Sequence, residues 1–287
     1  MMPVKSESTN SANFFFSLAC YAGLEDDYDF GFRYSRDMGP WTLDAAWFPM
    51  DEGSWSGDSE DSARYSYDIV TDGTRDNDER HQVNLRLARS FALGNGVTGE
   101  AGASCQYGLI PNGITGRNGH RNAQALHASF DYGPWNLKTE AIRYAFDLEN
   151  PAGQDDRYVV MGAFDFPYRV AARGAIYVAG LAYAWDTVEE TGGLLKSVTF
   201  YNDYSYLDKA EDAYSGSQQN VLGAGLDFDG PLYVTLDWAL GRNNAYIGPE
   251  LTRPLPDGGP VRRRSRRGTL HPRPRSLARA AAPTSIR

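Results

Sequence analysis

The sequence predicts an all-β protein of antiparallel strands, because apolar and polar residues alternate in separate segments and tight Gly-Pro turns join some of them. In residues 232–240, Leu, Val, Leu, Trp and Leu occupy the even positions, and Tyr, Thr, Asp and Ala occupy the odd ones. Successive side chains of a strand point to opposite faces, so this segment has one apolar and one polar face. No stretch shows a convincing helical period.

The same period of two recurs in residues 28–35, 82–91 and 219–228. In each segment, bulky apolar residues fill one set of positions, and polar residues or glycine fill most of the other. Weaker alternation elsewhere brings the expected total to about 12 to 13 strands. The remaining expected strands are residues 14–23, 41–50, 64–70, 98–110, 122–132, 135–148, 158–168, 175–185 and 197–207.

Two kinds of connection separate these segments. Residues 36–41 (RDMGPW) and 130–135 (FDYGPW) are near-copies in which Gly-Pro suits a tight hairpin turn, and residues 228–232 are a looser version. Short turns at one rim and long polar loops at the other are typical of an up-and-down transmembrane β-barrel. The long polar loops are residues 51–61, 71–80, 111–121 and 207–217.

The composition is compatible with such a barrel. Aromatic residues make up 13% of the 287 residues, with 18 Tyr and 6 Trp, and these side chains fit a pleated surface. No apolar run approaches the roughly 18 residues of a membrane helix, and the mean hydropathy is negative. A membrane-spanning strand needs only about 10 residues with alternate positions apolar, so low hydropathy does not exclude a barrel.

Charge divides the chain into unlike parts. Residues 1–251 hold 18 Lys and Arg against 36 Asp and Glu, a net charge of −18, whereas residues 252–287 hold ten Arg and one acid, a net charge of +9. Such a step predicts a boundary, so we expect a disordered or truncated N-terminus at 1–11, a barrel at 12–250 and a disordered Arg/Pro/Ala-rich tail at 251–287. The tail is either a basic arm for nucleic acid or anionic lipid, or out-of-frame translation of a GC-rich gene, which we prefer.

The N-terminal apolar stretch 14–20 does not resemble a signal peptide, because it is short and Glu7 follows Lys5. We interpret it as a strand, which implies that an export signal precedes the sequence. Cys20 and Cys105 both fall inside expected strands, and their spacing indicates neither a disulfide framework nor a metal site.

Several blocks of the sequence resemble bacterial outer-membrane porins of the phosphate-selective O/P-like family. The blocks are SVTFYNDYSYLDKAEDAYSGSQQNVLG (197–223), DYDFGFRYSRDMGPWTLDAAWF (27–48), SARYSYDIV (62–70) and LYVTLDWALGRNN (232–244). The resemblance covers roughly residues 12–250. It implies a water-filled barrel of about 16 strands in the outer membrane of a Gram-negative bacterium.

The sequence departs from that family at its ends and in its charge. Such barrels close with an even number of strands and a terminal aromatic residue, whereas this chain ends Ser-Ile-Arg, so we expect a fragment that lacks N-terminal strands and the closing C-terminal strand. A fragment should insert poorly, because an unpaired strand edge exposes backbone polar groups to hydrocarbon. Phosphate selectivity relies on basic residues in the pore, and a body with a net charge of −18 does not support it.

The polar faces of the expected strands are the candidate pore lining. By parity, the pore-lining candidates are Arg33, Arg86, Lys138, Glu140, Asp203, Asp227 and Asp237. Lys138 and Glu140 lie in 135–148, where the alternation is imperfect. The lipid-facing candidates on the opposite parity are Leu222, Leu226, Leu236 and Trp238. Rings of charged side chains set ion preference, so a balanced or acid-rich lining predicts weak selectivity that favours cations.

No motif predicts catalysis, a cofactor or a metal centre. Residues 94–99 match G-x-G-x-x-G, but a dinucleotide site needs a helix next, and residues 100–110 are more strand-like, so a glycine turn is expected. Acidic clusters at 58–61 and 76–79 are interpreted as solvated loop charge, with contact to divalent cations or lipopolysaccharide as the alternative. Metal-ligand spacing is absent among His81, His120, His127 and His271.

Three functions remain open. The first is a porin, not an enzyme, that passes small hydrophilic solutes or ions, contacts outer-membrane lipid and lipopolysaccharide, forms a homotrimer or another assembly, and binds no nucleic acid. The second is a non-conducting outer-membrane barrel with a structural or adhesion role. The third is a soluble, secreted β-rich binding protein. A continuous outward apolar band with aromatic girdles distinguishes the first two from the third.

Overall fold

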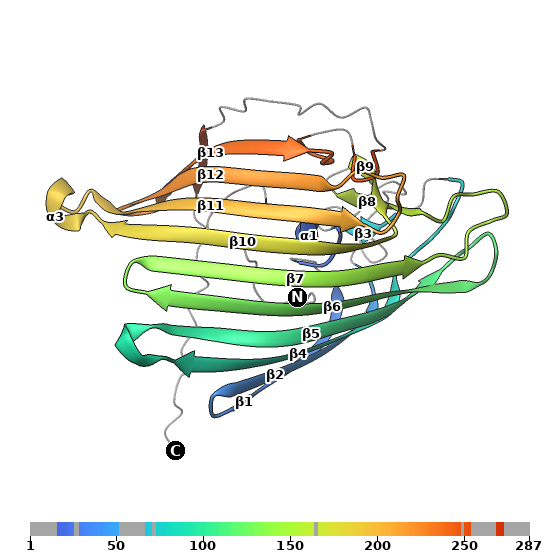
Figure 1. The fold of residues 1–287 in the computed structure, drawn as a ribbon, viewed down its shortest axis with the longest axis horizontal. Coiled ribbons are helices and arrows are strands. Elements are labelled where there is room, and N and C mark those ends of the chain that lie inside the picture. Colours follow the sequence, from blue (N-terminus) through green and yellow to red (C-terminus); the bar gives the residue numbers. More distant parts are fainter. Residues whose placement is uncertain are drawn as a thin grey trace, which may run out of the picture.

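The computed structural model of the chain describes residues 16–25, 29–51, 67–70, 73–163, 166–247, 250–253 and 268–272. Nearly all regular structure in these ranges is antiparallel strand, which confirms the predicted all-β class. Eleven strands form one arched main sheet (Figure 1). In order across the sheet they are β1 (Phe30–Met38), β2 (Trp41–Met50), β4 (Arg80–Ala92), β5 (Thr98–Pro111), β6 (Asn118–Tyr132), β7 (Trp135–Asp147), β10 (Arg173–Asp186), β11 (Leu195–Lys209), β12 (Ser217–Phe228), β13 (Leu232–Arg242) and β14 (Gly268–Pro272).

The two ends of the main sheet carry different connections. At the turn end, Gly39-Pro40 joins β1 to β2 and Gly133-Pro134 joins β6 to β7, as two-residue turns. Gly39 and Gly133 have φ angles of 66° and 53°, a left-handed conformation that glycine adopts without steric cost. The predicted glycine turn at 94–99 also lies at this end, where η1 (Gly94–Gly96) is followed by β5 and not by a helix. The opposite, loop end carries longer connections, such as residues 112–117, 148–157 and 210–216.

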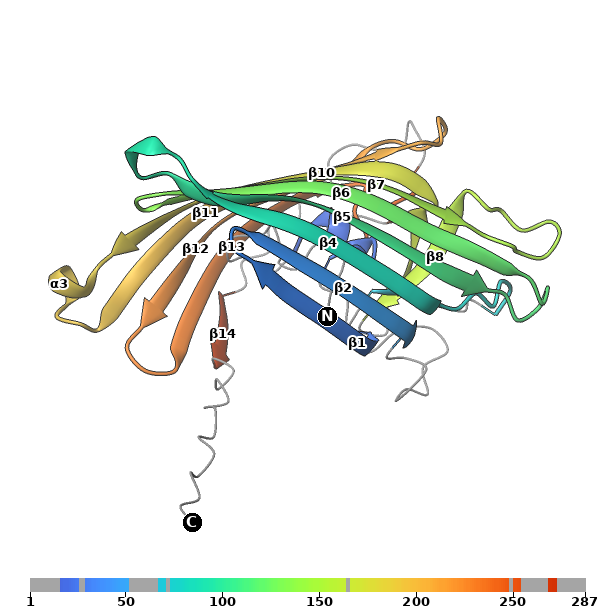
Figure 2. The same cartoon turned by 90° about the horizontal axis from the view of Figure 1, so that it is seen from below.

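A smaller sheet and a short helix lie on the concave side of the arch (Figure 2). This inner sheet consists of β3 (Asp68–Ile69), β8 (Tyr158–Ala163) and β9 (Phe166–Ala171). The helix is α1 (Leu18–Tyr21), whereas a second short helix, α3 (Val188–Thr191), joins β10 to β11 at the turn end. None of the helices in the described ranges is long and apolar enough to cross a membrane.

Apolar side chains of these inner elements pack against the concave face of the main sheet near the loop end. We call this group the inner cluster. It joins α1 and the inner sheet to the main-sheet strands β6, β7, β10 and β11, so its members come from segments far apart in the sequence. Its members include Leu18, Cys20, Tyr21, Leu24, Ile142, Tyr144, Phe146, Met161, Tyr168, Ile176, Val178, Leu207 and Leu251.

Three expectations about strands are wrong. Segment 14–23 contains α1, because the Ser17 hydroxyl caps a helical turn by accepting hydrogen bonds from the backbone N–H groups of Ala19 and Cys20. Segment 158–168 contains β8 and the start of β9, which leave the main sheet; its apolar start, YVVM, suits burial on both faces. The tail, expected to be disordered, contributes β14, which pairs with the edge of β13. Residues 1–15, 254–267 and 273–287 lie outside the described residues.

Glycine on the concave face of β12 makes room for an aromatic ring. A Cβ atom at Gly223 would collide with the Tyr201 ring of neighbouring β11. Tyr201 lies over Gly223 and donates a hydrogen bond through its hydroxyl to Asp237 of β13. The glycine therefore allows a contact that links three adjacent strands.

Gly223→Val should displace the Tyr201 ring and break its hydrogen bond to Asp237. We expect the free energy of unfolding in detergent to fall by about 1–3 kcal/mol, the usual cost of overpacking. Ala224→Val, one residue away on the convex face, is the matched control and should change it little. Urea unfolding followed by tryptophan fluorescence measures both variants, and equal losses would contradict the packing role of Gly223.

Candidate functional site

The concave face of the main sheet carries all seven residues that the sequence singled out by parity as candidate pore lining. Directly paired residues of antiparallel strands share a face. The register pairs Asp44 with Arg86, Glu140 with His127, and Asp237 with Gly223. These residues therefore lie on the face of the sheet that also carries the inner cluster. The structure thus brings onto one surface Arg33, Arg86, Lys138, Glu140, Asp203, Asp227 and Asp237.

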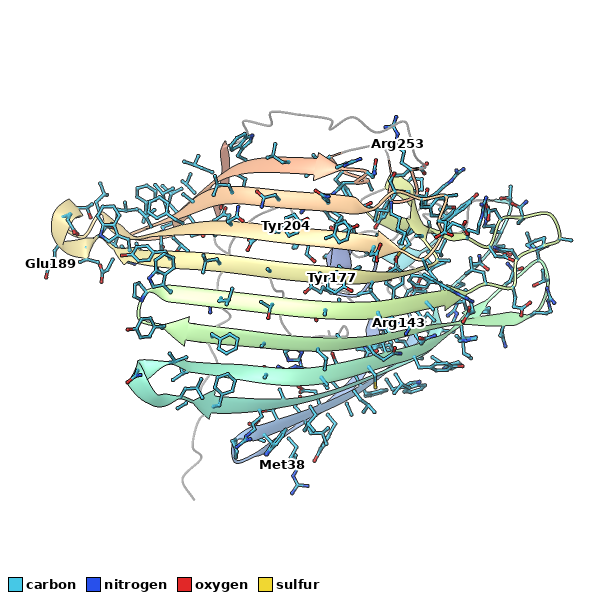
Figure 3. All side chains as sticks on the ribbon, in the orientation of Figure 1. Met38, Arg143, Tyr177, Glu189, Tyr204 and Arg253 are labelled. Atoms are coloured by element: carbon cyan, nitrogen blue, oxygen red, sulfur yellow. The ribbon has the colours of Figure 1, made fainter. Side chains whose placement is uncertain are left out.

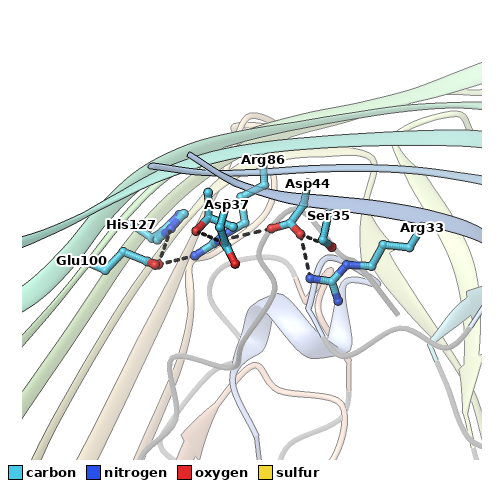
Figure 4. A network of polar contacts seen from close by, with 8 residues as sticks. Arg33, Ser35, Asp37, Asp44, Arg86, Glu100 and His127 are labelled. Atoms are coloured by element: carbon cyan, nitrogen blue, oxygen red, sulfur yellow. Dashed lines mark hydrogen bonds and ion pairs between the residues drawn. The ribbon is translucent and has the colours of Figure 1, made fainter. Parts of the chain in front are cut away.

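A network of charged groups crosses strands β1 to β6 near the middle of this face (Figure 4). Asp44 lies at its centre and is 1% exposed. Its Oδ1 accepts hydrogen bonds from Arg33 Nη2 at 2.9 Å and from the Ser35 hydroxyl at 2.6 Å, while its Oδ2 lies 3.3 Å from Arg86 Nη1. The network therefore holds one buried carboxylate between two guanidinium groups.

Arg86 extends the same network toward β5 and β6. Its Nη2 also forms an ion pair with Glu100, whose Oε1 is 3.7 Å from His127 Nε2. Arg86 and Asp44 are 6% and 1% exposed, so the ion pair between them lies out of water and is screened little by salt, whereas Glu100 is partly exposed. Two arginines and two carboxylates offset one another here, and Asp37, which accepts a hydrogen bond from the Thr42 hydroxyl, adds one more negative charge to this part of the concave face.

The concave face of strands β11, β12 and β13 is acidic, and we call it the acidic arm; the face of β1 to β6 is the other arm. Asp203, Asp227 and Asp237 lie on β11, β12 and β13, and Tyr201 donates a hydrogen bond to Asp237. Among the described residues on the concave face of these three strands, the basic side chain is Lys209, at the loop end. The concave face is therefore asymmetric, because ion pairs offset most of the charge on β1 to β6, whereas β11 to β13 carry mainly carboxylates.

Lys138 and Glu140 lie between these arms on β7. Both point to the concave side, so the imperfect alternation of 135–148 did not mislead the parity argument. Glu140 is 4% exposed and is paired in register with His127, and Lys138 is half-buried opposite Ser129. The two side chains continue the polar surface from the arm of β1 to β6 toward the acidic arm.

The inner cluster fills the loop end of the same face. Polar contacts hold it to the main sheet: Ser205 Oγ accepts from the Leu18 N–H at 3.2 Å, and Gln219 Nε2 donates to the Phe16 carbonyl at 2.6 Å. Arg121 Nη2 donates to the Gly23 carbonyl at 2.6 Å and forms an ion pair with Glu79. The concave side is thus divided into a polar half toward the turn end and a packed half toward the loop end.

Sequence reasoning missed parts of this site. Asp44 lies in a strand whose concave positions also include Ala46 and Phe48, so its polar face did not stand out. Glu79 was grouped with solvated loop acids, which is wrong, because it is 3% exposed and its burial raises the pKa of its carboxyl despite Arg121. Its neighbour Asp78 does follow the expectation and pairs with Arg80. The acids at 58–61 lie outside the described residues.

The convex face is apolar and carries all four lipid-facing candidates. Leu222, Leu236 and Trp238 are 48%, 51% and 51% exposed, and Leu226 is half-buried between Val198 and Val234. Tryptophans lie near the turn end, and further aromatic side chains lie toward the loop end. The exposed aromatic residues of this face include Trp41, Trp135 and Trp185, and then Trp47, Tyr107 and Tyr177. This arrangement fits an apolar band with aromatic girdles.

Comparison with known proteins agrees with this architecture. No protein-family model and no curated protein matches the sequence. Among solved structures, the chain matches the crystal structure of the outer membrane channel DcaP of Acinetobacter baumannii with a TM-score of 0.52 and 12% identity. The match covers 84% of this chain and 64% of that one, so the chain spans less than two thirds of the channel's length. At this identity the match shows a likeness in fold, an antiparallel sheet of long strands, and nothing about the role of the chain.

Arg86→Met should destabilise the sheet by about 3 kcal/mol, because it removes the guanidinium beside Oδ2 of the buried Asp44 and the ion pair with Glu100. Arg89→Met is the matched control, since Arg89 lies on the same strand but is exposed on the convex face. Urea unfolding in detergent measures the difference. If both variants lose equal stability, the network does not hold β2, β4 and β5 together.

Proposed function

We propose that this chain forms a passive channel of the bacterial outer membrane through which small hydrophilic solutes or ions diffuse. One observation carries the proposal: the same strands present a charged concave face and an apolar, aromatic-rich convex face. Such a pair of faces suits water on one side and lipid on the other. The match in fold to an outer membrane channel supports it.

The charges of the lining favour weak cation selectivity. Ion pairs neutralise Arg33 and Arg86 on one arm, so they offer little net attraction to an anion. The carboxylates of Asp203, Asp227 and Asp237 give the other arm a negative potential that attracts cations. A phosphate-selective pore is not part of this proposal.

The inner cluster favours a second candidate, a non-conducting barrel with a structural role. Its side chains are almost fully buried, and polar contacts with Ser205 and Gln219 hold α1 to the main sheet. Solutes that follow the concave face can pass the loop end only where this cluster leaves space or moves. Single-channel recording separates the two candidates, because a non-conducting barrel produces no current steps. The homotrimer remains an expectation from family resemblance.

Leu236→Arg should destabilise the inserted protein by about 2–4 kcal/mol if this position lies near the bilayer midplane. Asp237→Arg, on the opposite face of the same strand, should have a smaller effect, because it loses the hydrogen bond from Tyr201 but places the new charge on the concave side, away from lipid. Unfolding in lipid vesicles measures both variants. Equal destabilisation would show that the convex face does not contact lipid.

Asp203→Asn combined with Asp237→Asn should lower the preference for cations, because it removes two of the negative charges of the acidic arm. Reversal potentials across a planar bilayer with a salt gradient measure the permeability ratio, which should fall toward unity. Asp208→Asn is the matched control, since Asp208 lies on β11 but is exposed on the convex side. Strong anion selectivity of the unmodified protein would contradict the proposed lining.

A further inference from the structure

Arg143, in the loop-end half of the convex face, differs from nearby arginines in its contacts. Two nearby arginines pair with carboxylates: Arg173 with Asp147, and Arg117 with Glu149. Arg143 on β7 is exposed, and no side chain of the described residues forms an ion pair or hydrogen bond with its guanidinium. Beside it on β6 lies Gln124, its register partner, which is also exposed. A cation and an amide therefore point outward together.

These two side chains border a depression of about 570 Å³ in the convex face. Ala141 forms its floor, and the register places Leu126 and Tyr177 on either side of Ala141, with side chains that rise above it. Arg143 and Tyr177 come from the neighbouring strands β7 and β10 and lie on the same face of the sheet (Figure 3). The depression is an apolar hollow with a positive charge at its loop-end border.

Beyond the lining of this depression, small outward side chains follow along β7 toward the turn end. The next outward residue of β7 is Thr139, and its register partners on β6 and β10 are Ala128 and Ala179. Leu137 then closes the path between Phe130 and Leu181. From Arg143 to Leu137 the strand covers about 20 Å at the usual rise per residue. The resulting trough has the length and chemistry of a seat for one acyl chain.

We propose that this trough binds a membrane lipid with an exposed phosphate head group, whose phosphate contacts Arg143 and Gln124 and whose acyl chain lies over Ala141 and Thr139. The proposal rests on the proposed membrane orientation, since it assigns the convex face to lipid. It adds a specific site to that face.

Charge and position select this ligand. A guanidinium forms bidentate hydrogen bonds with phosphate oxygens, and the Gln124 amide can donate a further one. Tyr107 and Tyr177 lie near the level of Arg143, and tyrosine is enriched where lipid head groups meet the hydrocarbon. An arginine at that level reaches the head groups while its trough extends into the apolar band. Inorganic phosphate has no apolar group that could contact the Ala141 floor. The cation and the apolar floor together therefore indicate a lipid.

Lipid binding to the full chain in a non-ionic detergent tests the proposal. Native mass spectrometry counts the bound molecules during titration with dilauroyl phosphatidic acid, whose phosphate is exposed, and with dilauroyl phosphatidylcholine, whose phosphate carries a choline cap. Arg143→Gln should weaken retention of phosphatidic acid roughly tenfold, as expected for hydrogen bonds to a charged group. Arg143→Lys should retain part of the affinity, and circular dichroism checks that each variant keeps its strands.

Arg36→Gln is the matched control, because it removes the same charge from the exposed convex face of β1, far from the trough. It should bind phosphatidic acid as the unmodified protein does. Ala141→Phe fills the hollow between Leu126 and Tyr177 and should weaken lipid binding while the charge of Arg143 stays.

Three outcomes would overturn the proposal. The first is equal retention of phosphatidic acid by the Arg143→Gln and Arg36→Gln variants. The second is competition by inorganic phosphate as strong as that by the lipid, together with no effect of Ala141→Phe, because this describes a phosphate site. The third is a dimer mass, abolished by Arg143→Gln, in place of bound lipid. Since binding is measured without a bilayer, a failure of conductance would reject the channel and leave the lipid site to be judged by its own result.

Discussion

The alternation of side chains along each strand is the constraint on which the rest of the structure depends. A strand of the main sheet has to satisfy two environments at once, and Leu236 and Asp237 illustrate this on adjacent positions of β13. A slip of one residue in the pairing would exchange the two faces along the whole strand. In the proposed membrane setting, the backbone N–H and C=O groups of a strand must meanwhile find partners on neighbouring strands, because hydrocarbon offers none. Together these demands fix the register and make the sheet continuous.

The concave face shows how charge is tolerated within that register. Asp44 is buried, yet each of its oxygens meets a donor on an adjacent strand or on its own hairpin. The ion pairs join strands that are already hydrogen-bonded neighbours, so they reinforce the pairing and need no additional chain folding. On β12, glycine serves the opposite purpose and leaves space for the large Tyr201 ring. Charge pairs and aromatic rings therefore stabilise different arms of one sheet.

Much of this architecture could be predicted from the sequence. Period-two alternation identified the main-sheet strands from β1 to β13, and parity alone assigned Arg86 and Leu236 to opposite faces correctly. The inner elements could not be predicted in this way. The side chains of α1 and of the start of β8 are buried, so these segments have no polar face to produce alternation. The partners of Asp44 and Glu79 depend on contacts between strands, which a local pattern does not contain.

The inner sheet also determines the order in which the chain can fold. Neighbouring strands of the main sheet, such as β6 and β7 or β12 and β13, are joined by short turns, so their hairpins close with little loss of loop entropy. The inner sheet instead brings Ile69 of β3 against Met161 of β8, and this pairing closes a far longer loop. Non-local contacts of this kind form slowly. The main sheet can therefore form hairpin by hairpin, and the inner sheet then packs against strands that are already paired. We therefore expect the contacts of the inner sheet to form late, and native contacts that form after the rate-limiting step slow unfolding more than they speed folding.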